Sequence, residues 1–172
     1  MDLAMVTGQR EEDLSLIEFR PRPEATAWVE DGALWVIQGK TGNKVCIPLS
    51  LRLDVLGLEL GEVIARCRDN VLSPWLLHYR RNANSMHRGD RVGAQTLSKQ
   101  FLAARRLAGI TWPEGKTAPS FHEQRSLAIR EYTIKYGREF AQKLAGHNDA
   151  ATTATYIDDR GIGWMMVSAA DR

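Results

Sequence analysis

Residues able to bind a phosphate group are spread through the chain. Arg10 follows TGQ at the start of an expected helix, where an arginine and unpaired backbone N–H groups can bind an anion. His122 and Arg125 lie three residues apart in FHEQRS, so on a helix they share one face and can donate hydrogen bonds to one point. A planar guanidinium bonds two phosphate oxygens at once, which makes this pair a candidate phosphate site.

A candidate nucleophile lies in LAGHNDAATTATYIDDRG, residues 144–161, where His147 follows Gly146 and Tyr156 comes nine residues after His147. A tyrosine has a pKa of about 10, so at neutral pH it attacks poorly unless neighbouring cations favour the phenolate. The same cations would stabilise the extra charge of a pentavalent phosphorane. Lys40, in or beside the glycine-flanked turn GKTGNK, could add another cation.

Each of these features also has an ordinary structural interpretation. Gly146 can simply end a helix, and Tyr156 can be a half-buried aromatic residue of the next helix. Arg10, Lys40 and the face of the H-x-x-R helix can be solvated surface groups. In isolation these interpretations are favoured, so any chemistry depends on the combination.

The elements that must position these residues are mostly helices. Acidic residues in the first turn of 11–17 suit the positive end of a helix dipole, and Leu53 to Ile64 carries an apolar stripe at helical spacing. Ser120 and Glu123 have the spacing of a capping box. Helices are expected at 11–17, 51–67, 96–107, 121–136 and 138–145.

Strands are expected where the period changes. Residues 27–49 consist of β-branched and aromatic runs separated by the turn patterns DG, GK and TGN. The tail 162–168 is strand-like and must pair with the same sheet or with that of a neighbour. Before it, Asn148 or Asp149 could cap a short helix carrying Tyr156. Three antiparallel strands are expected near 27–30, 33–38 and 44–48.

The composition favours one soluble domain. A chain of 172 residues suggests a single domain with a substantial core, and 44% hydrophobic with 26% charged residues is typical of globular proteins. No apolar run approaches the roughly 18 residues of a membrane span, and the N-terminus lacks a signal-peptide pattern. Cys46 and Cys67 have no metal-ligand spacing and are expected to be reduced thiols of a cytosolic protein.

The sequence favours phosphate chemistry without a metal ion or ATP. It shows no acidic cluster suited to two Mg²⁺ ions and no G-x-x-x-x-G-K-[ST] loop. The net charge of +2 neither demands nor excludes nucleic acid. The polar, basic region 78–106 is either a solvated loop and helix or a phosphate-backbone track beside the site. If it is such a track, its candidate phosphate contacts are Arg80, Arg81, Arg88, Arg91 and Lys99.

TGQREEDL, GKTGNKVCIPL, PSFHEQRSLA and LAGHNDAATTATYIDDRG occur in this order, and together they resemble the catalytic domain of the tyrosine recombinases, above all phage integrases of the lambda type. That family carries an arginine after TG, a lysine on a β-hairpin turn, an H-x-x-R helix, a Gly-His pair and a tyrosine nine residues after that histidine. The resemblance covers essentially the whole chain. It implies an α+β, mainly helical catalytic fold, with a small three-stranded antiparallel sheet packed against a helical core.

The resemblance also implies roles at the matching positions. Tyr156 would attack the scissile phosphate, giving a 3′-phosphotyrosine and a free 5′ hydroxyl, and Lys40 would protonate the leaving 5′ oxygen. His122 would bond a non-bridging oxygen and assist proton removal, while Asp13 would be a supporting acid. The implied catalytic set is Arg10, Lys40, His122, Arg125, His147 and Tyr156, with no metal and no cofactor.

The implied partner is double-stranded DNA at attachment or core sites. A monomer would assemble into a tetramer on DNA, with C-terminal segments passing between protomers and with DNA-bending accessory proteins as further partners. No membrane is involved, and the location would be the bacterial cytoplasm, beside the nucleoid. The function implied is site-specific strand cleavage and rejoining for phage or genomic-island integration and excision.

We expect 1–172 to be a single catalytic domain without the additional DNA-binding domain that full integrases carry before it, either a natural short gene or an expressed fragment. Its affinity for DNA should then be weak, with cleavage of nicked or mismatched DNA its expected activity. Three alternatives stay open: an inactive integrase remnant acting as a DNA-binding or assembly module, a type IB topoisomerase-like enzyme, and a generic helical interaction domain.

Overall fold

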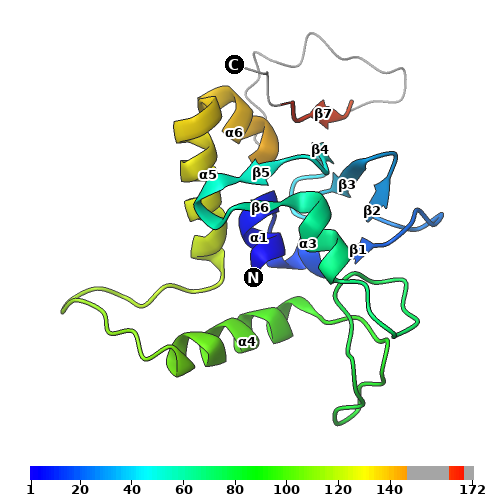
Figure 1. Cartoon of the computed structure of the whole chain (residues 1–172), viewed down its shortest axis with the longest axis horizontal. Coiled ribbons are helices and arrows are strands. Elements are labelled where there is room, and N and C mark those ends of the chain that lie inside the picture. Colours follow the sequence, from blue (N-terminus) through cyan, green and yellow to red (C-terminus); the bar gives the residue numbers. More distant parts are fainter. Residues whose placement is uncertain (147–162, 169–172) are drawn as a thin grey trace.

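The computed structural model describes residues 1–146 and 163–168, and its class is α+β and mainly helical, as expected (Figure 1). The helices are α1 (Asp2–Thr7), α2 (Glu11–Ser15), α3 (Leu60–Arg66), α4 (Ala94–Leu107), α5 (His122–Tyr136) and α6 (Arg138–Ala145), with a 3₁₀ turn η1 (Asp54–Leu56). The strands are β1 (Ile17–Glu18), β2 (Ala27–Glu30), β3 (Ala33–Ile37), β4 (Lys44–Pro48), β5 (Arg52–Leu53), β6 (Leu58–Glu59) and β7 (Met165–Met166). No helix in these two ranges is long and apolar enough to cross a bilayer.

The main sheet is mixed and five-stranded, in the order β1-β2-β3-β4-β7. Its centre is the predicted antiparallel trio, with Trp28 opposite Trp35 and Val36 opposite Val45. β1 and β7 add to the two edges in parallel. The predicted three-stranded sheet was therefore too small. β7 falls in the strand expected at 162–168, whereas β1 was missed because its two residues are too few to show a period-two pattern.

The strand predicted in the tail pairs within the same chain. Met165 lies opposite Val45 and Met166 opposite Cys46. Trp164 fixes this strand, since its ring stands edge-on to Trp35 and to Trp28, with centroid distances of 4.8 and 5.7 Å. These three tryptophans pack against one another. Edge-to-face aromatic pairs of this kind add specific stabilisation to the apolar area they bury.

The helix predicted at 51–67 was wrong in its first half. Leu51 and Leu53 are buried and the residue between them is exposed, which is the alternation of a strand. Gly57, with φ of 63°, ends η1 in a conformation that glycine adopts without strain. Only then does α3 begin, with Glu59 and Glu62 forming a reciprocal capping box.

The centre of the molecule is α1, an element not anticipated from the sequence. Its residues Leu3 to Thr7 are all buried, and it packs against α5 and α3. The buried Tyr132 of α5 donates a hydrogen bond of 2.7 Å to the carbonyl of Val6. Gly8 ends α1 with φ of 61°, and directs the chain toward α2. The segment carrying Arg10 is thus anchored between buried elements.

The last two helices form a tight pair that begins and ends as predicted. Ser120 donates its backbone N–H and its hydroxyl to the Glu123 carboxylate, so the capping pair forms, although the hydroxyl does not accept from the Glu123 backbone. α5 stops at Gly137 and α6 at Gly146. The expected helix carrying Tyr156 lies outside the described residues.

α4 stands apart from this body, below it in Figure 1. Its contacts include α2 and the start of α5: the Ser98 hydroxyl donates to the Glu11 carboxylate, and the Phe101 and Phe121 rings pack edge to face at 5.9 Å. The residues before it form the predicted loop. Cys46 and Cys67 carry free thiols, as expected.

Candidate active site

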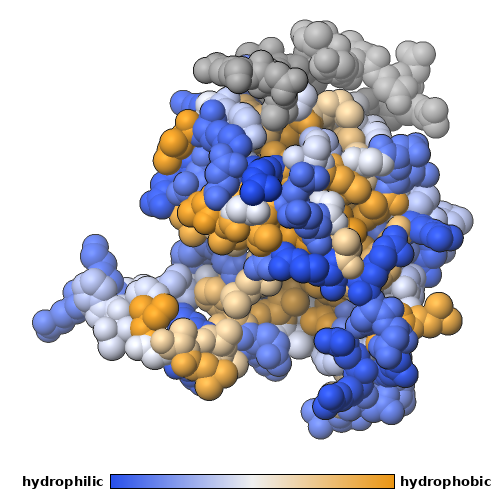
Figure 2. Space-filling view, in the orientation of Figure 1, coloured by the Kyte–Doolittle hydropathy of each residue, from blue (hydrophilic) through white to orange (hydrophobic). Residues whose placement is uncertain are grey.

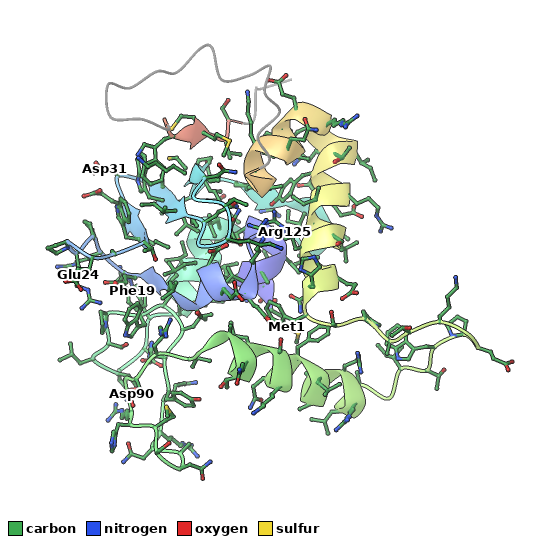
Figure 3. All side chains as sticks on the ribbon, turned by 180° about the vertical axis from the view of Figure 1, so that it is seen from behind. Met1, Phe19, Glu24, Asp31, Asp90 and Arg125 are labelled. Atoms are coloured by element: carbon green, nitrogen blue, oxygen red, sulfur yellow. The ribbon has the colours of Figure 1, made fainter. Side chains whose placement is uncertain are left out.

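Arg125 is the buried centre of the site. It points from α5 toward the middle of the molecule (Figure 3), where one guanidinium nitrogen donates to the carbonyl of Gly8 at 2.5 Å and another to the carbonyl of Ala145 at 2.6 Å. Burial, and next the nearby charge of Arg10, lower the pKa of Arg125 to about 10. The group therefore stays charged at neutral pH and joins the end of α1 to the end of α6.

Arg10 lies beside it at the start of α2. It is half-buried, and its Nη1 donates to Oε1 of Gln38 at 3.2 Å. The two guanidinium groups are close enough that the charge of Arg10 acts on Arg125. Two like charges held together repel, and a bound anion would relieve that repulsion. The structure thus brings together the two arginines that the sequence motifs singled out.

Asp13 supports the turn that carries Lys40. Its Oδ1 accepts a hydrogen bond of 2.9 Å from the backbone N–H of Gly39, while its Oδ2 is buried without a hydrogen-bond partner in the described part of the chain. Burial raises the pKa of Asp13, against the lowering effects of the Gly39 hydrogen bond and of Arg10. A carboxylate with one unpaired buried oxygen beside two arginines is a costly arrangement, typical of a functional site.

Lys40 and His122 are both exposed. Lys40 lies on the hairpin turn between β3 and β4, where it forms no ion pair with any residue of 1–146 or 163–168. His122 opens α5, one helical turn before Arg125. The structure places both on elements that reach the arginines, but it does not bring their side chains into contact with Arg10 or Arg125.

His147 and Tyr156 lie outside the described residues. The residue before His147 is described: Gly146 ends α6 with φ of 65°. Because Arg125 bonds Ala145, the chain leaves α6 directly beside the arginine pair. The segment that contains the candidate nucleophile therefore starts at the site.

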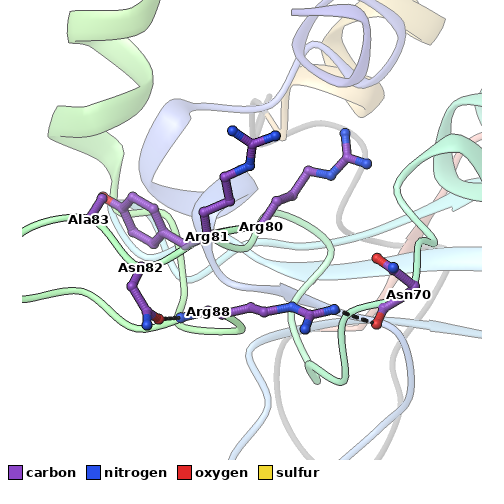
Figure 4. A pocket seen from close by; sticks show the side chains of 7 residues that line it. Asn70, Arg80, Arg81, Asn82, Ala83 and Arg88 are labelled. Atoms are coloured by element: carbon purple, nitrogen blue, oxygen red, sulfur yellow. Dashed lines mark hydrogen bonds between the residues drawn. The ribbon is translucent and has the colours of Figure 1, made fainter.

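A second cationic feature is the loop between α3 and α4, where hydrophilic residues gather at the lower right of Figure 2. It forms one side of a shallow, open pocket of about 860 Å³ (Figure 4). Arg88 is fixed there: its side chain donates to the carbonyl of Asn70, and its backbone N–H donates to Asn82, both at 2.8 Å. The pocket is lined by Asn70, Tyr79, Arg80, Arg81, Asn82, Ala83 and Arg88.

The five candidate DNA contacts differ in their surroundings. Arg80 forms an ion pair of 3.1 Å with Asp69, and the guanidinium of Arg91 lies over the ring of Trp75, 5.6 Å from its centroid. Arg81 and Lys99 are exposed. Arg91 is thus directed onto an aromatic ring, whereas the side chains of Arg80 and Arg81 extend together from one wall of the pocket (Figure 4).

Sequence reasoning missed three buried amides around the arginines: Gln9, Gln38 and Asn43. Each is next to a motif that was noticed, since Gln9 precedes Arg10 and the other two flank the Lys40 turn. The signal that could have revealed them was an amide side chain lying inside or next to each motif. No group of three or more His, Cys, Asp or Glu side chains in the described ranges is arranged to hold a metal ion.

Two neighbouring arginines and a buried acid thus lie together at the junction of α1, α5 and α6, an arrangement that could hold a phosphate-like anion. The family model for the phage integrase family matches residues 1–161. This chain belongs to the phage integrase family.

Named relatives and solved structures agree with this assignment. The chain is 46% identical over 167 residues to the integrase of Enterobacteria phage P21, covering 97% of this chain and 41% of the relative. It is 47% identical to the prophage integrase IntE of Escherichia coli K12, covering 98% and 42%. The lambda integrase catalytic core superposes with a TM-score of 0.77 and 32% identity, covering 98% of this chain and 84% of that one.

The lambda integrase tetramer bound to a Holliday junction is also similar, with a TM-score of 0.72 and 31% identity, covering 92% of this chain and 42% of that one. This chain thus spans about two fifths of the length of the curated relatives it matches.

Proposed function

We propose that this chain is the catalytic domain of a phage or genomic-island integrase, which cleaves and rejoins DNA at specific sites through a 3′-phosphotyrosine. The observation that carries the proposal is the bond from Arg125 to the carbonyl of Ala145 beside Arg10. It joins a two-arginine anion site to the start of the segment with His147 and Tyr156. Family membership supports the same chemistry.

The proposed reaction conserves the phosphodiester energy. The Tyr156 hydroxyl oxygen attacks phosphorus, the bond from phosphorus to the 5′ oxygen breaks, and the phenolic proton passes to a base, for which exposed His122 is the candidate. Lys40 gives a proton to the leaving 5′ oxygen. Arg10 and Arg125 stabilise the charge on the non-bridging oxygens, and removing one such donor typically costs about 3–4 kcal/mol. Rejoining is the same reaction reversed, so no ATP is consumed.

His147 is proposed as a further donor to a non-bridging oxygen. It directly follows Gly146, whose carbonyl accepts a hydrogen bond from Asn43, and Ala145 before it accepts one from Arg125. Asp13 is proposed to orient the Lys40 turn through Gly39. The proposed chemistry needs no metal ion, because the charge of the transition state is met by arginine, histidine and lysine.

The proposed substrate is double-stranded DNA, contacted by the basic loop as well as by the active site. Solved lambda integrase structures include a dimer bound to a core site and a tetramer on a Holliday junction. By analogy we propose a tetramer on DNA for this chain, a monomer without DNA, and DNA-bending proteins as accessories. The work would take place on DNA in the bacterial cytoplasm, with residues 1–172 as one catalytic domain.

The test uses a labelled duplex carrying a candidate core site with a nick just past the scissile phosphate, so that the short cleaved fragment diffuses away. Incubation in EDTA followed by a denaturing gel should show protein joined to the 3′ phosphate. The product should disappear in Tyr156→Phe, which is expected to bind DNA normally.

Two results would overturn the proposal. Bound DNA without covalent product would indicate an inactive remnant. Covalent product formed equally well on any sequence would indicate a topoisomerase-like enzyme.

A further inference from the structure

We propose that Gln38 is a positioning residue that fixes three parts of the catalytic site to one another: Arg10, the Lys40 turn and the end of α6. Gln38 follows β3 and is fully buried. This inference rests on the proposed function, since it concerns how the site is held for cleavage.

The amide of Gln38 uses its full hydrogen-bonding capacity. Its Nε2 donates to Oε1 of Gln9 at 2.7 Å and to the carbonyl of Ala145 at 3.1 Å. Its Oε1 accepts from Nη1 of Arg10 at 3.2 Å and from the hydroxyl of Thr41 at 2.9 Å. A primary amide has two N–H donors and two acceptor sites, so all four are occupied and its orientation is fixed.

Gln38 is also in van der Waals contact with the end of α6. A Cβ atom added to Gly146 would lie 2.3 to 2.7 Å from the three amide atoms of Gln38. No side chain fits at that distance. The amide therefore packs on the backbone of the residue that precedes His147, and Gly146 is required both by this contact and by its φ of 65°.

The other carbonyls at the end of α6 are bound in the same way. Gln9 donates to the carbonyl of Leu144 at 2.7 Å, and Asn43 donates to that of Gly146 at 2.5 Å. The last carbonyls of a helix have no partner within the helix and commonly bind water. Here side chains from the α1–α2 junction, the β3–β4 hairpin and α5 bind them, which fixes the exit of the chain.

Gln38 connects Arg10, the Lys40 turn and the end of α6 through a single side chain. Shifting any one of the three would break at least one of its hydrogen bonds. Phosphoryl transfer needs the nucleophile, the phosphate-binding groups and the acid in register, and a misplacement of about 1 Å can cost about 100-fold in rate. Gln38 does not need to touch DNA to have this effect.

The test uses the whole chain and the nicked duplex. Gln38→Glu keeps the shape and the acceptors but removes both donors, and Gln38→Met removes donors and acceptors. Both variants should bind DNA like the wild type, while covalent product at saturating DNA forms about 100-fold more slowly. The matched control is Val63→Ala, which opens a small cavity in α3 away from the site and should leave the cleavage rate unchanged below its melting temperature.

A milder variant covers the case in which the buried substitutions fail to fold. Thr41 is exposed, so Thr41→Val leaves the core intact and removes one of the four hydrogen bonds of Gln38. It should slow cleavage about fivefold, the effect of about one neutral hydrogen bond.

The outcomes separate the two proposals. Wild-type product with unchanged rates in the folded Gln38 variants and in Thr41→Val would overturn the positioning role and leave the proposed function standing. If Val63→Ala cleaves as slowly as the Gln38 variants, the slower cleavage reflects lower stability of the fold, and the positioning role of Gln38 is also overturned. No product from the wild type on bound DNA would overturn the proposed function and this inference together.

Discussion

Nη2 of Arg125 donates a hydrogen bond of 2.6 Å to the carbonyl of Ala145, two residues before His147. The same guanidinium reaches the carbonyl of Gly8, two residues before Arg10. One buried cation thus connects the chain segments that supply a second phosphate-binding arginine and the candidate nucleophile. The carbonyl end of α6 carries partial negative charge, which favours a cation there.

This relationship predicts that Arg125 matters for folding as well as for cleavage. Arg125→Ala would leave the carbonyl of Gly8 without its donor, at a cost of about 1–3 kcal/mol, and would leave the carbonyl of Ala145 with Gln38 as its remaining donor. We expect a lower melting temperature together with loss of covalent product.

Arg125→Lys should keep the charge but cannot bond both carbonyls and a phosphate, so cleavage should still fall about 100-fold. Thermal unfolding and the nicked-duplex assay measure the two effects; a Lys variant with full activity would contradict the bidentate role.

Lys40 should be needed only to protonate the leaving oxygen. Its side chain is exposed on the turn, so Lys40→Ala should fold normally while covalent product forms about 100-fold or more slowly, the usual contribution of a positioned general acid. A duplex with sulfur in place of the scissile 5′ oxygen should restore the rate, because a thiolate leaves without a proton. Arg125→Ala should not be rescued by the same duplex, and rescue of both variants would argue against a specific acid role for Lys40.

The sequence allowed the arginine pair to be predicted better than the scaffold that holds it. TGQR, the hairpin turn and H-x-x-R each mark a local arrangement, and the structure places Arg10 and Arg125 together. The sheet centre was also predictable, because 27–48 shows strand composition between turn patterns. The partners of Arg125 were not, since Gly8 lies 117 positions away and no local spacing records such a contact.

The predictions that were wrong or missing have identifiable physical causes. Leu53, Leu56 and Leu60 fit a helical stripe, yet Leu51 and Leu53 also fit a strand, and the role of Gly57 as a helix stop was overlooked. Gln38 went unnoticed because a glutamine beside a glycine turn is usually solvated. Its importance arises only when α6 packs against the hairpin and excludes water.

Asp13 makes the stability of the domain depend on pH. Burial raises its pKa above the ordinary value of 3.8, so the folded state binds its proton more tightly than the unfolded chain does. Its contribution to stability is therefore full below pH 3.8 and decreases as the pH rises through the raised folded pKa. Asp13→Asn should flatten this part of the profile and raise stability at neutral pH. Urea unfolding between pH 3 and 7 measures the free energy of unfolding of both proteins. If the difference in this free energy between wild type and Asp13→Asn does not change with pH, the raised pKa of Asp13 is contradicted.

The same Asp13→Asn variant should cleave more slowly than the wild type. An amide still can accept from Gly39, so the turn can form, but the negative charge next to Arg10 and Arg125 is lost. We expect stability and activity to move in opposite directions, as happens where a strained charge is kept for function. Faster cleavage in Asp13→Asn would remove Asp13 from the supporting role.

Deleting 162–172 removes β7 together with Trp164. The deletion uncovers the Trp28 and Trp35 rings and one edge of β4, and an exposed strand edge tends to pair with another chain. We expect a lower melting temperature and a change in the cleavage rate or in assembly on DNA. Gel shift, light scattering and the nicked-duplex assay report these effects. Unchanged cleavage with unchanged oligomer size would show that the tail has no role in coupling protomers.

The basic loop should contribute to DNA affinity without affecting the chemical step. Each phosphate contact that is lost reduces the dependence of log K on log salt by about 1. Arg81 is exposed at the pocket wall, so Arg81→Ala should weaken binding at all sequences and lower this slope. Arg91 lies over Trp75 instead, so Arg91→Ala is the matched control and should change the slope less. Binding titrations at several salt concentrations measure the affinity and the salt slope of each variant. The cleavage rate at saturating DNA should match that of the wild type in both variants. Equal slopes for wild type and Arg81→Ala would place the DNA backbone away from this loop.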